Sequence, residues 1–351
     1  MSTGPQRPAA SILIPVRNEE RWIRETAAAM LAQRFDGELE FLFVDGRSED
    51  STKTILEELA REDPRIRVLD NPARELTPAL NIALRAARGD WVARMDAHSW
   101  YPEDYVKRGV ERLRRGGVEW VTGPAVPRAT GTWARRVAIA LGTELGQGGS
   151  AKWSGTGAGR GEDEPAELEL DTGVFAGVWP RAALERLGGW DEGWPVNEDA
   201  EMAGRVLGAG GRIVCLPAMG AEYAPRDSLS GLARQYARFG FYRVKTSRRH
   251  PIALRRSHLA SGALALTAAG ALLPGRTPRR AARGGVGLYA VALGALSVRA
   301  GRRAGAGPGD VAALPIVLAV MHLGWGFGFL AGCARFGPPW AGVRRALAGS
   351  S

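Results

Sequence analysis

Short apolar runs alternate with segments of helical periodicity over the first hundred residues, and this alternation restricts the possible folds more than any other feature. The apolar runs cover residues 11–16, 39–44, 66–69 and 91–94. Each has the length of a buried strand, and apolar residues recur at helical spacing between the runs, as in residues 22–31. This pattern predicts a parallel, doubly wound α/β sheet.

Polar residues follow these strands at the points where each strand ends. Asn18, Asp45 and Asp70 follow the first three strands, and Asp96 with His98 follows the fourth. The carboxyl ends of parallel strands form one edge of a sheet, and ligands bind at that edge in folds of this class. Asp96 and His98 are two residues apart, so in an extended chain their side chains point the same way. A carboxylate and an imidazole placed together suit a divalent metal that also carries phosphate oxygens.

Several other kinds of site are disfavoured by the motifs that the sequence lacks. No G-x-G-x-x-G follows the first strand and no G-x-x-x-x-G-K-[ST] occurs, which argues against dinucleotide and P-loop sites. Cys215 and Cys333 are the only cysteines, so they provide neither a disulfide framework nor a cysteine-rich metal site. Residues 1–10 lead into a strand pattern rather than a signal-peptide core, so we expect the first domain to stay in the cytosol.

The second half of the predicted sheet domain contains a long loop and an acidic turn. Residues 142–163 are rich in Gly and poor in large apolar residues, which predicts a loop, either a lid over the site or a simple insertion. Residues 190–199 are dense in acidic and aromatic side chains and precede a predicted helix at 200–207. Glu198 and Asp199 therefore lie at a helix N-terminus, where carboxylates are also stabilising for purely structural reasons.

The C-terminal part of the chain differs sharply in charge from the part before it. Residues 228–351 hold 18 Lys and Arg and one acid, Asp310, giving +17, whereas residues 1–227 carry −7. The basic clusters alternate with three long uncharged stretches, residues 257–275, 284–298 and 311–334. This alternation favours a membrane as the partner. Nucleic acid is not expected, because aromatic residues are not interleaved with the arginines as a stacking surface requires.

This contrast predicts a site domain over residues 1–227, a basic amphipathic connecting helix over 228–256 and a membrane-associated hydrophobic tail over 257–351. The third uncharged stretch is long enough to span a bilayer, whereas the second is short. If the first two stretches both spanned, the four arginines between residues 276 and 283 would lie outside, against the positive-inside tendency. A re-entrant or interfacial first pair and a buried helical domain of a soluble protein therefore stay open as alternatives.

The ordered set of motifs resembles the family 2 glycosyltransferases, nucleotide-sugar-dependent enzymes with the GT-A fold, a Rossmann-like, mostly parallel sheet with flanking helices. More narrowly, the chain is similar to the bacterial succinoglycan-type exopolysaccharide glycosyltransferases. Those carry Asp-Ala-His in the metal motif and His-x-x-x-Gly-x-Gly-Phe in a membrane tail, here from His322 to Phe329. The resemblance extends from residue 11 to about residue 337. The other matching pieces are Ile14-Pro15-Val16-Arg17-Asn18-Glu19, Val44-Asp45-Gly46-Arg47-Ser48, Asp96-Ala97-His98, Gly188-Gly189-Trp190-Asp191-Glu192, Asn197-Glu198-Asp199 and Gln235-Tyr236-Ala237-Arg238-Phe239.

The resemblance implies a role for each residue that matches a family motif. Asp45 would contact the uracil or ribose of a nucleoside-diphosphate sugar. Asp96 and His98 stand where an Asp-x-Asp motif holds the ribose and a divalent metal, Mg²⁺ or Mn²⁺, on the diphosphate. Asp199 stands at the position of the general base. The other substrate-binding residues expected from the matching motifs are Pro15, Arg17, Glu19 and Glu198.

A further motif match lies on the predicted connecting helix. Gln235 and Arg238 match the Gln-x-x-Arg-Trp motif, which helps to hold the diphosphate and the acceptor. Two positions depart from the family pattern. Phe239 replaces the tryptophan of this motif, which is typical of processive synthases, and His98 replaces the usual second acid of the metal motif.

Together these inferences predict an inverting, metal-dependent glycosyltransferase that moves a hexose from a UDP-sugar to a lipid-linked or growing polysaccharide acceptor. The basic tail predicts action at the cytoplasmic face of the cell (inner) membrane. Direct displacement of a diphosphate needs its charge neutralised and needs a base at the acceptor hydroxyl. Two alternatives stay open. Release of UDP would exclude a non-catalytic membrane partner of a polysaccharide assembly, and consumption of nucleoside triphosphate with sugar phosphate would indicate a sugar-nucleotidyltransferase.

Overall fold

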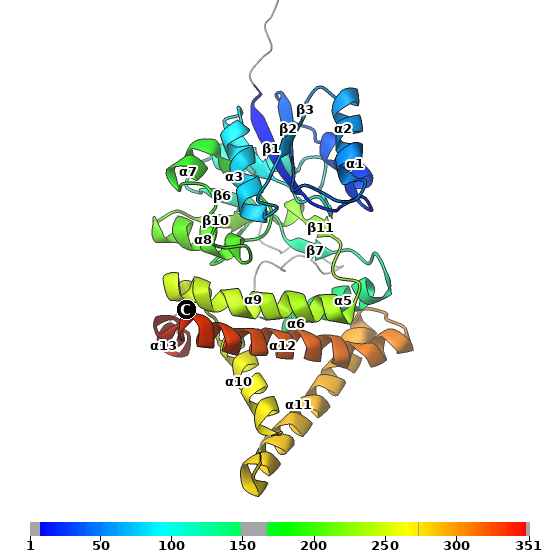
Figure 1. Cartoon of the computed structure of the whole chain (residues 1–351), viewed down its shortest axis with the longest axis vertical. Helices are drawn as coiled ribbons and strands as arrows, with labels where there is room; N and C mark the ends of the chain where they lie inside the picture. The colour runs from blue at the N-terminus through cyan, green and yellow to red at the C-terminus, as the bar shows by residue number, and fades with distance from the viewer. Residues whose placement is uncertain (1–7, 149–166, 273, 349–351) are drawn as a thin grey trace, which may run out of the picture. The chain divides into compact units, whose positions relative to one another are not determined.

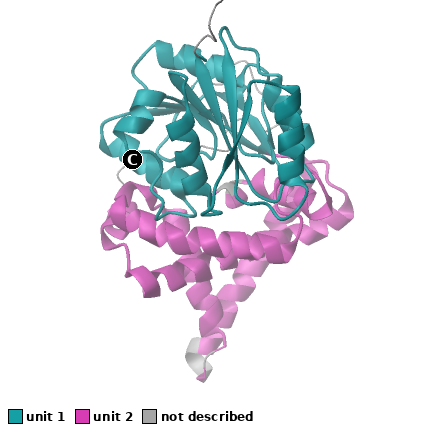
Figure 2. Cartoon of the chain, turned by 45° about the horizontal axis from the view of Figure 1, so that its top comes forward, with its two compact units in different colours: residues 1–126, 154–223 teal, residues 127–153, 224–351 magenta. Residues whose placement is uncertain are grey.

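The computed structural model describes residues 8–148, 167–272 and 274–348. The chain forms two compact units (Figure 2). Unit 1 comprises residues 1–126 and 154–223, and unit 2 comprises residues 127–153 and 224–351. Much of the loop predicted at residues 142–163 lies outside the described residues. Its described beginning includes a short helix, α6 (Glu144–Gln147).

Unit 1 is built on a mostly parallel sheet, which has eight strands within the described residues (Figure 1). The four predicted strands are present as β1 (Ala10–Val16), β2 (Leu39–Asp45), β3 (Ile66–Asp70) and β4 (Trp91–Arg94). They pair in parallel in the order β3-β2-β1-β4, so their carboxyl ends share one edge. The prediction of a mostly parallel α/β sheet is confirmed.

The later strands extend this sheet beyond β4 in the order β9-β6-β10-β8. Their bounds are Gly177–Pro180 for β9, Trp120–Thr122 for β6, Ile213–Cys215 for β10 and Leu168–Glu169 for β8. β9 runs antiparallel to both β4 and β6. It begins at a glycine because a Cβ on Gly177 would lie 2.0 Å from Nε1 of Trp120. A second, three-stranded sheet contains β5 (Ser99–Trp100), β11 (Ala221–Tyr223) and β7 (Ala125–Pro127).

Amphipathic helices connect the strands and bury their apolar faces. In α2, for example, the buried residues are Thr52, Ile55 and Leu56, at the i, i+3, i+4 spacing of a single helix face. The helices of unit 1 are α1 (Ile23–Leu31), α2 (Thr52–Glu62), α3 (Leu76–Ala86), α4 (Tyr105–Arg114), α7 (Arg181–Arg186) and α8 (Glu198–Gly208).

At the amino end of the sheet, a buried carboxylate links the first strands by hydrogen bonds. Glu40, near the start of β2, accepts hydrogen bonds from Oγ of Ser11 (2.7 Å), the backbone N–H of Arg88 (2.7 Å) and Nη1 of Arg67 (3.0 Å). Burial alone raises the pKa of Glu40, but these hydrogen bonds outweigh burial and hold the pKa below its ordinary value. This cluster therefore links the first strands at the edge opposite their carboxyl ends.

Unit 2 consists mainly of helices. They are α5 (Thr132–Leu141), α6, α9 (Leu229–Arg249), α10 (Arg256–Gly270), α11 (Arg276–Arg303), α12 (Pro308–Phe336) and α13 (Trp340–Ala348). The sequence-based division placed residues 127–148 in the site domain, whereas in the structure these described residues group with the C-terminal helices. The buried carboxylate of Asp310, on α12, gives the physical reason, because it pairs with Arg135 and Arg136 on α5.

Glycines let α9 and α12 pack closely along each other (Figure 1). Gly324, Gly328 and Gly332 recur every four residues along one face of α12. At each of them a Cβ would lie 2.0–3.2 Å from a backbone oxygen of α9. Gly326 serves a different contact, because its Cβ would lie 2.1 Å from the carbonyl oxygen of Ser261 on α10. The glycines of the His-x-x-x-Gly-x-Gly-Phe motif therefore allow two close helix contacts.

Two helices of unit 2 are long and apolar enough to cross a membrane. Among the described residues they are Arg279–Arg303, which forms most of α11, and Pro308–Phe336, which is α12. α10 covers most of the first uncharged stretch but is only 15 residues long. All three uncharged stretches of the C-terminal region are therefore mainly helical.

Candidate active site

Two loops at the carboxyl edge of the sheet are tied together around Asp45. This residue ends β2, is buried, and accepts hydrogen bonds from the backbone N–H (3.2 Å) and Oγ (2.6 Å) of Ser48. The same hydroxyl accepts a hydrogen bond from the backbone N–H of Asn18 (2.9 Å). Oδ1 of Asn18 in turn accepts one from the backbone N–H of Glu49 (2.9 Å). The loops after β1 and β2 therefore hold each other in place at the edge where Asp45 lies.

Arg94 is a residue that the sequence analysis did not select, and it joins two of the predicted motifs. It ends β4 and its side chain is only 2% exposed. Its Nε and Nη2 donate to the two carboxylate oxygens of Asp96, at 2.8 and 3.2 Å, and its Nη1 donates to Oε1 of Glu198 at 3.1 Å. A bidentate pair of this kind fixes the plane of a carboxylate. The structure therefore brings Asp96 and Glu198 into one cluster.

Negative charge exceeds positive charge in this cluster. Burial raises the pKa of Glu198, Arg94 lowers it, and the charges of Asp199 and Asp96 raise it again, to about 7 overall. Burial alone would lower the pKa of Arg94, but the carboxylates of Asp96 and Glu198 raise it, so the guanidinium stays charged. Two acidic side chains thus contact this guanidinium, and a third, Asp199, interacts with it electrostatically. Strongly shifted pKa values of this kind are typical of functional sites.

His98 is oriented by Glu19. Nδ1 of the ring lies 3.0 Å from Oε1 of Glu19, and the backbone N–H of Glu19 donates to Oγ1 of Thr52 at 2.7 Å. Because an ionised carboxylate only accepts hydrogen bonds, we assign the proton to Nδ1, which places the lone pair of the neutral ring on Nε2. A carboxylate behind an imidazole is the usual arrangement around a metal-binding histidine.

The residues at this edge fit a divalent metal that is held jointly with a diphosphate. No group of three or more His, Cys, Asp or Glu side chains forms a metal cage within the described residues. Mg²⁺, however, usually takes one or two protein ligands and completes its shell with substrate phosphates and water. Asp96 and His98 offer a carboxylate oxygen and an imidazole nitrogen, and the Glu19 contact orients the imidazole. This donor set is consistent with a shared metal–diphosphate site.

The acidic turn before α8 is held by a reciprocal pair of hydrogen bonds to α3. The backbone N–H of Trp190 donates to Oδ1 of Asn81 (2.9 Å), and Nδ2 of Asn81 donates to the carbonyl oxygen of Trp190 (2.8 Å). Gly189 precedes the turn with φ +71°, and a Cβ there would lie 2.5 Å from Oδ1 of Asn81. Asn81 is a second residue that the sequence analysis missed, although an amide on the buried face of an amphipathic helix is a usable signal.

Asp199 lies in the first turn of α8, as predicted. Asn197 is the N-cap residue with φ 63°, a left-handed conformation, and its side chain makes no capping hydrogen bond. Oδ1 of Asp199 accepts a hydrogen bond from the backbone N–H of Ala200 at 2.8 Å. The chain also passes close to Gly173, where a Cβ would lie 2.3 Å from the carbonyl oxygen of Asp199. The position of this residue is therefore fixed by packing and by its helix turn.

The remaining predicted site residues divide between the two units. Pro15 lies in β1, and Nη1 of Arg17, in the loop that follows, donates to the carbonyl oxygen of Arg74 at 3.1 Å. Both lie at the carboxyl end of β1 with Glu19. Gln235 and Arg238 lie on α9, in unit 2. Joint action of these two residues with the site of unit 1 stays a prediction.

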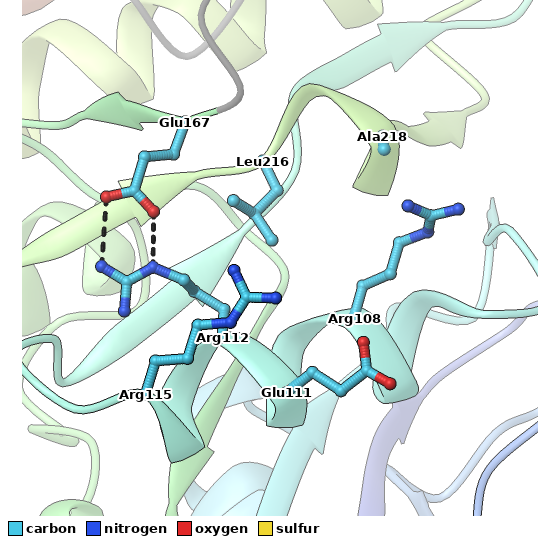
Figure 3. Close-up of a pocket in the computed structure, with 7 residues that line it drawn as sticks. All are labelled: Arg108, Glu111, Arg112, Arg115, Glu167, Leu216 and Ala218. Carbon is cyan, nitrogen blue, oxygen red and sulfur yellow. Dashed lines mark hydrogen bonds and ion pairs between the residues drawn. The ribbon is translucent and has the colours of Figure 1, made fainter.

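A pocket elsewhere on unit 1 is lined by arginines but contains none of the predicted site residues (Figure 3). It lies between α4 and the segment that contains Leu216 and Ala218. Arg112 pairs there with Glu167, with Nη2 to Oε1 at 3.1 Å, and Arg108 pairs with Asp104. Two of its arginines are thus already neutralised by carboxylates, so we keep the strand-end cluster as the candidate active site.

Comparison with known proteins identifies the family. The family model for glycosyl transferase family 2 matches residues 11–161. The chain is 32% identical over 324 residues to the succinoglycan biosynthesis protein ExoA of Rhizobium meliloti (strain 1021). That match covers 91% of this chain and 93% of ExoA, so the similarity includes the C-terminal region as well as the sheet.

Solved structures agree with this result at the level of the fold. The mannosyltransferase PcManGT from Pyrobaculum calidifontis, in complex with GDP-Man and Mn²⁺, superposes with a TM-score of 0.57 at 21% identity, covering 91% of this chain and 87% of PcManGT. S. aureus TarS 1–349, in complex with UDP, gives a TM-score of 0.50 at 16% identity, covering 93% of this chain and 91% of TarS. The sheet order, the strand-end carboxylates and the near-full-length similarity to ExoA together show that this chain belongs to glycosyl transferase family 2 and is a glycosyltransferase with the GT-A fold.

Proposed function

We propose that this glycosyltransferase moves a hexose from a UDP-sugar to a lipid-linked or growing polysaccharide acceptor, with inversion at the anomeric carbon, in exopolysaccharide biosynthesis. The observation that carries the proposal is the Arg94 cluster, in which Asp96 of the predicted metal motif is bonded through one guanidinium to the Glu198–Asp199 turn. A direct displacement needs these two kinds of carboxylate, one beside the leaving diphosphate and one beside the attacking hydroxyl. The similarity to ExoA supports the exopolysaccharide role.

Asp96 and His98 are the proposed ligands of the metal, Mg²⁺ or Mn²⁺. Arg94 holds both oxygens of the Asp96 carboxylate, and Glu19 orients the ring of His98 so that Nε2 carries the lone pair. When bound, the metal would neutralise charge on the departing diphosphate. The negative excess of the cluster favours a cation, and PcManGT was solved with Mn²⁺.

The donor site would use the edge formed by the first two strands. Asp45 is proposed to contact the uracil or ribose, since Ser48 and Asn18 hold its loop in place. Pro15 and Arg17 lie at the adjacent strand end and complete the proposed site. UDP is the proposed nucleotide by family resemblance, and the TarS structure holds UDP whereas PcManGT holds GDP-Man.

Asp199 is the proposed general base, and it would take the proton from the acceptor hydroxyl as the bond to the anomeric carbon forms. Glu198 is proposed to be a substrate-binding residue, by its match to the family motif. Its carboxyl is also bonded to Arg94, so it would help to position the cluster and the adjacent Asp199. Because the acceptor oxygen attacks directly, the mechanism needs no second carboxylate as a nucleophile, in contrast to retaining glycosidases.

The acceptor is proposed to be lipid-linked, at the cytoplasmic face of the inner membrane. The two apolar helices and the +17 charge of residues 228–351 support membrane association. Gln235 and Arg238 are proposed to help hold the diphosphate and the acceptor, by their match to the family motif.

A UDP-release assay tests this function. Membranes containing the full-length chain are mixed with a panel of sugar nucleotides and a lipid extract of the producing cells. Release of UDP that depends on one UDP-sugar, on the extract and on a divalent metal is the expected result. No release with any sugar nucleotide would favour a non-catalytic partner, whereas consumption of UTP with a sugar phosphate would indicate a nucleotidyltransferase.

A further inference from the structure

α10 and α11 form a V that projects from the rest of unit 2, below α12 in Figure 1. Between the arginines at the two ends of α11, the large side chains exposed on this V are apolar. Leu266, Leu272, Leu288 and Val291 are each at least 60% exposed. Only 11% of the most apolar 18-residue segment of α11 is buried within the protein, against 50% of the corresponding segment of α12. An apolar surface of this extent is normally covered by another molecule.

The composition of α11 indicates that the cover is the interior of a bilayer rather than its surface. Residues 284–298 contain no charged side chain. A helix that lies in the plane of a membrane surface presents a charged or polar face to water, and this segment has none. α10 is likewise uncharged from Ser257 to its end at Gly270. Both arms of the V therefore suit immersion in hydrocarbon.

Arginines bound the uncharged segment of α11 at both ends. Four arginines lie between residues 276 and 283, at the tip of the V, and Arg299, Arg302 and Arg303 lie at its base. From Arg283 to Arg299 the helix rises ~24 Å, at 1.5 Å per residue. Arginine side chains extend toward headgroups by several ångströms, so the two sets can reach both surfaces of a hydrocarbon core about 30 Å thick. A tip that stopped at the bilayer centre would leave four arginines where they are most unfavourable.

α12 is long and apolar enough to cross a membrane, but its packing against α9 argues that it does not. α9 runs along its second half, in contact with Gly324, Gly328 and Gly332. Arg234 and Arg238 lie exposed, one turn apart, on that part of α9. If α12 crossed the bilayer, α9 would carry these two arginines into the hydrocarbon with it. If α12 instead lies along the membrane surface, α9 lies on its water-facing side, and the two arginines stay out of the hydrocarbon.

We propose that α10 and α11 cross the inner membrane as a hairpin, and that α12 lies flat at the cytoplasmic surface beneath α9. The orientation follows from the distribution of Lys and Arg. Of the 18 basic residues in 228–351, 14 belong to segments at the base of the hairpin and four to its tip. The positive-inside tendency therefore places the base in the cytoplasm and the tip outside. This proposal rests on the membrane association proposed above and does not depend on the chemistry of transfer.

Single cysteines at three positions test this topology in the full-length protein. The parent carries Cys333→Ala and keeps Cys215, which is fully buried. Gly284→Cys marks the tip, Gly309→Cys marks the start of α12, and Ala341→Cys marks the residues after it. A Cβ at Gly284 or Gly309 meets nothing within 4 Å, and Ala341 is exposed, so none of the three should disturb folding. Each is labelled with a membrane-impermeant maleimide in right-side-out spheroplasts and in inverted membrane vesicles, with the parent as the blank.

The expected result is that Gly284→Cys labels in spheroplasts, whereas Gly309→Cys and Ala341→Cys label in inverted vesicles, each at least 10-fold above the opposite preparation. Labelling of Gly309→Cys and Ala341→Cys from opposite faces would show that α12 spans, and would overturn the proposal. Labelling of Gly284→Cys from the same face as Gly309→Cys would show a re-entrant or peripheral hairpin, and would overturn it as well. Because labelling needs no turnover, a failure here is distinguishable from a failure of the proposed transfer reaction.

Discussion

Two clusters of acids and arginines, each with a buried carboxylate, lie at opposite edges of the same sheet, and they differ in the balance of charge. At the amino edge, Glu40 is paired with two arginines, Arg67 and Arg88. At the carboxyl edge, Arg94 interacts with three acids, Asp96, Glu198 and Asp199. The first cluster has more positive than negative charge around a single carboxylate. The second has the reverse.

The pKa values follow this difference. Hydrogen bonds hold the pKa of Glu40 below its ordinary value although the group is buried, whereas the pKa of Glu198 rises to about 7. A carboxylate with enough donors is a structural link between strands. A group of carboxylates that share too few donors is destabilising until a cation or substrate arrives, and it is therefore the better candidate for a functional site. Substitutions at both edges of the sheet test whether the two clusters differ in this way.

Removing the metal-motif acid should have the largest effect. Asp96→Ala should reduce transfer by more than ~10³-fold and abolish metal-dependent UDP binding. The reason is that the metal would lose its carboxylate ligand, so the negative charge that develops on the diphosphate would no longer be stabilised. Calorimetric titration of UDP with and without Mn²⁺ provides the check. Glu40→Gln is the matched control at the other edge. It should lower Tm but leave UDP affinity and the transfer rate of the folded protein unchanged. UDP binding by the wild-type protein that is insensitive to chelator would refute the metal assignment.

The next effect is on stability. Arg94→Gln should lower the free energy of unfolding by about 3–5 kcal/mol, the range for breaking a buried pair by removal of one partner. The loss should be smaller for Glu40→Gln, because Arg67 and Arg88 are 37% and 58% exposed and can turn to solvent. Urea unfolding of the detergent-solubilised protein measures both. A loss for Arg94→Gln no larger than that for Glu40→Gln would remove the distinction between the clusters.

The two clusters should also respond to pH with opposite signs. The folded-state pKa of Glu198, about 7, lies above the ordinary 4.5, so its contribution to stability is present at low pH. It should fall by on the order of 3 kcal/mol as the pH rises from about 4.5 through 7. The pKa of Glu40 is lowered, so its contribution is present above pH 4.5 and is lost as the pH falls below that value. Unfolding free energies measured against pH in chelator, relative to Glu198→Gln and Glu40→Gln, should show these two slopes. Equal signs would contradict the account.

The smallest expected effect is at His98. His98→Asp should keep transfer within about tenfold of wild type and shift preference from Mn²⁺ toward Mg²⁺, because a carboxylate oxygen replaces an imidazole nitrogen. The measurement is the transfer rate as a function of each metal. Rates that are identical for both metals in both proteins would show that His98 does not contact the metal.

The sequence predicted the first four strands and the edge at which Asp45, Asp96 and His98 lie, because strand–helix alternation directly specifies a parallel sheet. It did not predict the antiparallel direction of β9, since a four-residue apolar strand carries no directional information. Arg94 was missed as well. A charged residue at the end of an apolar run requires a buried partner, and that was a usable signal. The pairing of Asp310 with α5 depends on contacts distant in sequence, which no local pattern encodes.

The role of Asp199 is tested most directly by Asp199→Asn in the full-length protein. Asp199 follows the N-cap residue Asn197 in the first turn of α8, so asparagine there loses only a charge–dipole interaction of about 0.3–1 kcal/mol. A structural role alone therefore predicts a small change in Tm and near-normal transfer. The matched control is Glu185→Gln on α7, where the acid is exposed and pairs with Arg181 one turn away. Tm, UDP-sugar affinity and transfer rate are measured together. If Asp199 is the general base, Tm should change little and UDP-sugar affinity should be unchanged, with transfer lowered about 10²–10⁴-fold, the range for loss of a general base. Normal transfer by the folded Asp199→Asn protein would contradict it.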